Sequence, residues 1–141
     1  MLLTVAFGPL GVFFLWVLHA HGALVVPPAP ASPRTAFLLL LAAPLLEELA
    51  FRGALRDLCM AAMSRLGLPD HPYLTLPNLL ASIAFAACHL PHQPPLLAAS
   101  LLLPSLLLGR VREVTHSLLP CIVLHAWFNL CFLMVFTQWP A

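Results

Sequence analysis

Apolar residues fill five long stretches of the chain, separated by short segments rich in proline, glycine or arginine. The stretches cover residues 2–26, 35–55, 78–90, 96–109 and 118–136. At about 1.5 Å per helical residue, the first is long enough to cross a hydrocarbon core of about 30 Å. The fourth is short for a span and contains Pro104, which predicts a kink, a tilt or an extension into the preceding loop. The pattern predicts an all-α polytopic transmembrane helix bundle of about five spans, in a single domain over residues 1–141.

The segments between these stretches carry loop signals. Prolines cluster at 27–33 and at 91–95, after the first and third stretches. The second stretch is expected to continue as an amphipathic helix to about Leu66, before a turn-rich loop at 67–77, and a polar loop is expected at 110–117. The first stretch has no preceding basic residue and is long for the apolar region of a signal peptide, so we expect it to be retained as a helix.

Composition narrows the class of protein. Hydrophobic residues make up 62% of the chain and charged residues 8%, which is too little charge to cover a water-soluble domain. The net charge of +1 provides no basic patch, so nucleic acid is not an expected partner. The four cysteines show no CxxC spacing and are expected to pack as small apolar residues, not as disulfides or a zinc knuckle.

Arginine placement predicts an orientation in the membrane. Arg56 and Arg65 follow the second stretch, and Arg110 and Arg112 follow the fourth. With five spans these segments share one side, and the opposite side carries only Arg34. The positive-inside rule then places the N-terminus in the cytoplasm. The heavy use of Ala, Leu, Pro and Arg suits a GC-rich bacterial genome, so the expected location is a bacterial inner membrane.

Four polar side chains fall at similar depths on three of the predicted spans. Measured along the helix axis, Glu47 lies about 18 Å and His89 about 17 Å from the predicted start of its span. His125 and Asn129 lie about 12 and 18 Å along the fifth span. Because ionisable groups inside a bilayer are costly, their agreement in depth indicates a functional site near the middle of the membrane.

Helical spacing assigns these groups different tasks. Glu48 and Arg52 are four residues apart, so we expect an ion pair between them. Glu47 points about 100° away around the helix, which leaves it free to act as a general base toward water. His125 and Asn129 share a helix face and are placed to donate hydrogen bonds to one oxygen, as an oxyanion requires.

A covalent serine mechanism is disfavoured. The chain has no GxSxG nucleophile elbow. Serines in apolar helices usually bond back to their own helix, and we expect this of Ser82, Ser100 and Ser105. The residues therefore favour direct attack by water, activated by Glu47 with help from His89.

Three short motifs occur in order along the apolar helices. Residues 47–52 (EELAFR) fit EExxxR, residues 85–89 (FAACH) fit FxxxH, and residues 125–129 (HAWFN) fit HxxxN. Together they resemble the CPBP family of intramembrane proteases, which includes the type II CAAX prenyl endopeptidases and bacteriocin-processing relatives. The chain resembles a minimal catalytic core of that family, whose members are commonly longer.

The resemblance implies a peptidase whose site is sunk in the bilayer. It implies that Glu47 activates the water, with His89 assisting, and that His125 and Asn129 stabilise the oxyanion. Glu48 and Arg52 would support the site. The implied partners are the lipid bilayer and a membrane-anchored or transmembrane protein or peptide substrate. Short bacterial relatives have been linked to the trimming of C-terminal sorting or anchoring segments.

The motifs fit two mechanisms, one without a metal ion and one with Zn²⁺. The family has been described first as metalloproteases and later as glutamic proteases. The chain lacks HExxH, the usual zincin pattern, so we expect a glutamic mechanism without a cofactor. The alternative is Zn²⁺ held by Glu47, His89 and His125, with water in the fourth position.

Two other functions fit part of the pattern. Intramembrane Glu, His and Arg also build proton relays, as in a small transporter, although no inverted repeat is visible. A noncatalytic homologue that binds membrane peptides would keep the fold and tolerate the loss of Glu47. Dependence on Glu47 distinguishes an enzyme from such a protein, and ion flux in liposomes distinguishes a transporter from both.

Overall fold

In the computed structural model, which describes residues 2–26, 29–30, 32–67 and 75–138, the chain forms five helical stretches. They are α1 (Leu2–Ala20), a continuous helix over 33–66, α5 (Leu76–His89), α6 (Pro95–Ser100) followed at once by α7 (Leu102–Thr115), and α8 (Leu119–Phe136). A short parallel pairing joins β1 (Ala29–Pro30) to β2 (Thr137–Gln138). The predicted all-α helix bundle is confirmed.

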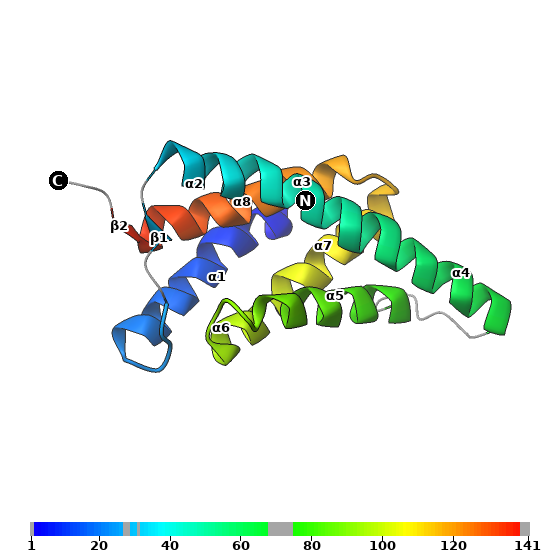
Figure 1. Ribbon diagram of the computed structural model, residues 1–141, viewed down its shortest axis with the longest axis horizontal. Coiled ribbons are helices and arrows are strands. Elements are labelled where there is room, and N and C mark those ends of the chain that lie inside the picture. The colour runs from blue at the N-terminus through cyan, green and yellow to red at the C-terminus, as the bar shows by residue number, and fades with distance from the viewer. Residues whose placement is uncertain (1, 27–28, 31, 68–74, 139–141) are drawn as a thin grey trace.

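The longest helix carries the two adjacent glutamates. Its parts are α2 (Pro33–Phe37), the π-helical η1 (Leu38–Ala42), α3 (Ala43–Glu48), the π-helical η2 (Leu49–Leu55) and α4 (Arg56–Leu66). The Ser32 side chain caps its first turn, and Gly67 ends it in the left-handed conformation at φ 64°. The predicted extension to Leu66 is confirmed, and α4 projects beyond the other helices (Figure 1).

Two predicted loops are shorter in the structure. The helix α7 continues through the predicted loop at 110–117 as far as Thr115, because Arg110 and Glu113 form an ion pair one turn apart on the helix surface. The helix α5 begins inside the predicted loop at 67–77, because Pro77 occupies a first-turn position where proline is tolerated. The part of that loop at 68–74 lies outside the described residues.

The first apolar stretch is not helical to its end. The helix α1 stops at Ala20, and Gly22 at φ 71° turns the chain back on itself. Leu24 and Val26 are then buried in an apolar cluster with Val12 of α1 and with residues of α6 and α8. Tertiary burial of this segment therefore replaces the continued helix predicted from its hydrophobicity.

The distribution of polarity is that of a membrane protein. Large apolar side chains face outward, such as Leu58 at 68% and Met134 at 69% exposure, whereas Glu48 at 0% and Arg52 at 1% are among the most buried. Two helices, Pro95–Thr115 and Leu119–Phe136, are long and apolar enough to cross a membrane. Two further apolar helices are shorter and cover Thr4–Ala20 of α1 and Leu76–His89, which is α5. An outer surface of this kind is suited to lipid, not to water.

The helix α8 contacts most of the other helices around the site. It packs against α1, α3, η1 and α7, and α5 packs against α7 and η2 (Figure 1). Trp127 of α8 donates to the Val5 carbonyl of α1 at 2.9 Å. Between α5 and α7, the Asn78 side chain donates to the Leu106 carbonyl at 3.1 Å, directly beside Gly109. Three helices that bear the sequence motifs are thereby brought to one place.

Candidate functional site

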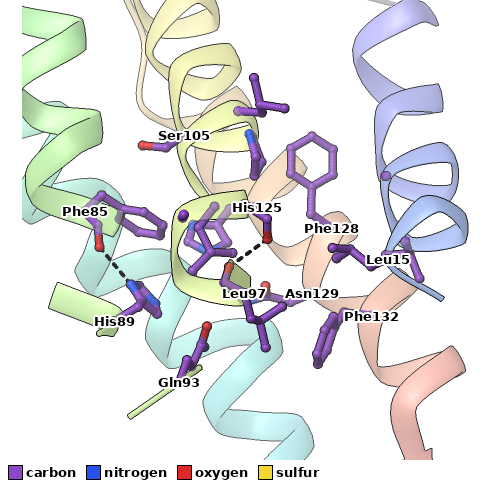
Figure 2. A pocket seen from close by; sticks show the side chains of 18 of the residues that line it. Leu15, Phe85, His89, Gln93, Leu97, Ser105, His125, Phe128, Asn129 and Phe132 are labelled. Carbon is purple, nitrogen blue, oxygen red and sulfur yellow. Dashed lines mark hydrogen bonds between the residues drawn. The ribbon is translucent and has the colours of Figure 1, made fainter. Parts of the chain in front are cut away.

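A cavity of about 550 Å³ opens between α1, α3, α5, α6, α7 and α8. Its walls are mostly apolar, and Figure 2 shows Phe85, Leu97, Phe128 and Phe132 around it. All four predicted catalytic side chains line this cavity, namely Glu47, His89, His125 and Asn129. A few convergent polar groups in an apolar hollow are the usual form of a binding or catalytic site.

The predicted ion pair between Glu48 and Arg52 is present and buried. Arg52 Nη1 donates to Glu48 Oε1 at 3.1 Å. On the other side, Arg52 Nη2 donates to the Ser105 carbonyl oxygen at 2.9 Å and to Ser105 Oγ at 2.6 Å. The guanidinium also lies 4.8 Å from the centre of the Phe85 ring. Three neighbouring groups thus fix the arginine in position.

His125 lies between the two adjacent glutamates. Its Nδ1 is 2.8 Å from Glu48 Oε1, and its Nε2 is 3.5 Å from Glu47 Oε2. Because Arg52 carries a permanent charge, the paired Glu48 is a carboxylate and can only accept. Nδ1 of His125 therefore donates to Glu48, and Nε2 faces Glu47 and the cavity.

The two glutamates have different surroundings. The Glu48 side chain is fully buried, whereas the Glu47 side chain is 30% exposed. Glu48 Oε1 takes both the arginine and the histidine contacts, and Oε2 has no hydrogen-bond partner among the described residues. Glu47 is therefore the carboxylate available to a molecule in the cavity, as the helical spacing predicted.

His89 lines the same cavity as Glu47. Its Nδ1 donates to the Phe85 carbonyl at 2.8 Å, one helical turn back (Figure 2). Within the described part of the chain, no hydrogen bond joins His89 to Glu47. The Phe85 ring lies against the rings of both His89 and His125, with centroids 4.7 and 5.8 Å apart. The remaining nitrogen of His89, Nε2, has no hydrogen-bond partner among the described residues.

Asn129 is held by a carbonyl of the π-helical segment η1. Its Nδ2 donates to the Leu39 carbonyl oxygen at 2.8 Å. The prediction had both donors of His125 and Asn129 free for one substrate oxygen. In the structure one amide hydrogen of Asn129 is already used, and the second remains for a ligand in the cavity.

The three motifs lie within one known protein family. The family model described as type II CAAX prenyl endopeptidase Rce1-like matches residues 30–131. This chain belongs to that family. The match includes every predicted site residue from Glu47 to Asn129, and the family indicates a CAAX-protease-like membrane peptidase acting on a peptide or protein. No curated protein and no solved structure matches the chain.

The donor set of this Rce1-like chain does not fit the alternative zinc site. Glu47 and His125 approach within 3.5 Å, but residues 2–26, 29–30, 32–67 and 75–138 contain no group of three His, Cys, Asp or Glu side chains that could hold a metal ion. His89 belongs to the same cavity and turns its Nδ1 to the backbone.

Two of the three serines expected to bond back to their own helix backbone have other hydrogen-bond partners. The Ser105 hydroxyl accepts from Arg52, and among the described residues no bond from it to the backbone of α7 is found. Ser100 does bond back, donating to the Leu97 carbonyl at 2.7 Å, whereas Ser82 donates to the Asn78 side chain. A signal for Ser105 was present, since a buried guanidinium has five N–H groups and Glu48 alone cannot satisfy them.

Proposed function

We propose that this protein is a glutamic intramembrane endopeptidase in which Glu47 activates the attacking water. The observation that carries this proposal is the asymmetry of the two glutamates. Glu48 accepts hydrogen bonds from Arg52 and His125. Glu47 is open to the cavity, with His125 Nε2 3.5 Å from its Oε2. A carboxylate in a largely apolar cavity is a suitable general base, since it competes with little bulk water.

Charge balance favours a doubly protonated His125 in the reacting state. Two carboxylates, Glu47 and Glu48, then face two cations, Arg52 and His125, and the cluster is neutral. A neutral cluster costs less to bury than one with a net charge. In this state His125 donates from Nδ1 to Glu48 and presents an N–H at Nε2.

The reaction then needs only groups already in the cavity. Glu47 takes a proton from water as the oxygen attacks the scissile carbonyl carbon. The N–H at His125 Nε2 and the second amide hydrogen of Asn129 stabilise the resulting oxyanion. The C–N bond breaks as Glu47 returns its proton to the leaving amine. His89, with Nε2 free, orients the water or assists the proton transfer.

The proposed substrate is a membrane-anchored or transmembrane protein. Its cleaved segment must be extended, because the carbonyl groups of a helix are already hydrogen bonded. The mostly apolar cavity wall suits apolar side chains beside the scissile bond. We place the protein in a bacterial inner membrane with the N-terminus in the cytoplasm.

The test compares the termini of membrane proteins in cells that carry the native chain or Glu47→Gln. Glutamine keeps the size of the side chain and removes the base, so we expect a loss of specific cleavage of about 100-fold or more. Uncut precursors should accumulate and identify the substrate. The measurement is mass spectrometry of protein termini at equal abundance of both chains.

Asp57→Asn is the matched control, since this carboxylate is 52% exposed and is not among the residues that line the cavity. It should cleave as the native chain does. Unchanged termini with folded Glu47→Gln protein would contradict the proposal. A proton flux in liposomes that depends on Glu47 would then favour a transporter, and its absence would favour a noncatalytic peptide-binding protein.

A further inference from the structure

Four buried side chains form one continuous hydrogen-bonded line from α7 to the cavity. Ser105 accepts from Arg52 at 2.6 Å, Arg52 donates to Glu48 at 3.1 Å, and Glu48 accepts from His125 at 2.8 Å. Ser105 is 1% exposed, so its hydroxyl has no access to bulk water. The line ends at the imidazole whose Nε2 faces Glu47.

Ser105 uses both of its oxygens on one arginine nitrogen. Nη2 of Arg52 has two hydrogens, and the Ser105 carbonyl and hydroxyl accept at 2.9 and 2.6 Å. This fixes the plane of the guanidinium, which in turn presents Nη1 to Glu48 Oε1. Without the hydroxyl, one hydrogen of a buried cation loses its acceptor, and the guanidinium is free to rotate toward another one.

We propose that Ser105 is a positioning residue that sets the proton on His125 through Arg52 and Glu48. Because Glu48 Oε1 is held in place, Nδ1 of His125 carries a hydrogen in every protonation state. Nε2 is then always the nitrogen that faces the reacting groups. This inference rests on the proposed function for its meaning in catalysis, but the placement of the proton can be measured without a substrate.

The test uses paired variants of the full chain in detergent micelles, with histidine labelled with ¹⁵N. Ser105→Ala removes the hydroxyl. Ser105→Thr and Ser105→Val have nearly the same shape and differ in whether a hydroxyl is present. Ser82→Ala removes a buried serine hydroxyl on α5 that does not contact Arg52 and serves as the control. The His125 signals are identified by their loss in His125→Gln.

The expected spectrum of the native chain, Ser105→Thr and Ser82→Ala shows His125 with a hydrogen on Nδ1. Ser105→Ala and Ser105→Val should add a population in which Nδ1 is bare and Nε2 carries the hydrogen. With the precursor identified by the Glu47→Gln comparison as substrate, kcat should fall about tenfold in Ser105→Ala and Ser105→Val, with KM little changed.

A native His125 spectrum in both Ser105→Ala and Ser105→Val would overturn the inference. So would a Ser105→Thr protein that folds but behaves like Ser105→Val. If both hydroxyl-free proteins fail to fold while Ser105→Thr is native, Ser105 serves folding and the inference is also wrong. Cleavage that survives Glu47→Gln would contradict the proposed function alone, since the spectrum does not depend on Glu47 as a base.

Discussion

At the scale of single residues, two adjacent carboxylates differ in burial and in the contacts that they make. Glu48 is fully buried and contacts Arg52 and His125, whereas Glu47 is 30% exposed to the cavity. The two side chains are chemically identical, so their different environments alone assign their roles. This separation predicts that their amide variants fail in different ways.

Glu48→Gln should destabilise the protein strongly, because it leaves the buried Arg52 without its counter-charge. The expected loss is about 3–5 kcal/mol in the free energy of unfolding. Denaturant unfolding in detergent, followed by circular dichroism, measures it. Glu47→Gln is the matched comparison and should unfold close to the native midpoint while lacking activity. Equal stability of Glu48→Gln and Glu47→Gln would contradict the role assigned to Glu48.

At the scale of elements, the contact of α5 with α7 depends on a glycine, Gly109, which has no side chain. A Cβ added at Gly109 would lie 1.7 Å from Asn78 Oδ1, far inside contact distance. The Asn78 amide bridges to the Leu106 carbonyl of α7 and accepts from Ser82 at 3.2 Å. The small residue therefore allows a polar side chain to join two apolar helices, as is usual in membrane bundles.

Gly109→Ala should displace Asn78 and cost about 1–3 kcal/mol of stability. Gly53→Ala is a matched helical control, since the nearest atom to its added Cβ is 3.6 Å away. Thermal unfolding of both proteins in the same detergent provides the comparison. The double variant Gly109→Ala with Asn78→Ala should cost less than the sum of the two single changes. Simple additivity would show that the two positions do not interact.

At the scale of the whole molecule, ion pairs join two arginine-bearing segments that are distant in sequence. Asp57 of α4 pairs with Arg56 at 3.0 Å and with Arg112 of α7 at 3.7 Å. These contacts bring Arg56 and Arg112 together, and the prediction that both arginine-bearing segments face one side of the membrane stays a prediction. Under the positive-inside rule, this end of the molecule should face the cytoplasm.

A cysteine introduced at Ser64, near the end of α4, should report this orientation, since the remaining Cys121 and Cys131 are buried. In a chain with Cys59 and Cys88 changed to serine, Ser64→Cys should react with a membrane-impermeant maleimide only after the cells are opened. A cysteine at Arg34 should react in intact cells, because the predicted topology puts this residue on the opposite side of the membrane. Labelling of the Ser64 position from outside would reverse the proposed topology.

The sequence by itself determined the class of protein and singled out the four polar side chains that line one cavity. Periodic hydrophobicity depends on neighbours along the chain, so helices near the predicted stretches and the Glu48–Arg52 pair could be predicted from local spacing. The end of the first helix could not, because burial of Leu24 in a distant cluster ended it at Ala20. Local patterns cannot report such burial.

Only the tertiary structure decided which partners the site residues find. Ser105 lies 53 residues from Arg52, His125 lies 77 from Glu48, and Asn129 lies 90 from Leu39. These contacts form because buried donors must find acceptors wherever packing brings them together. The physical reason is the absence of water in a buried site, which forces polar groups from distant parts of the chain to satisfy one another. The sequence therefore contains the polar side chains, and packing determines which of them contact one another.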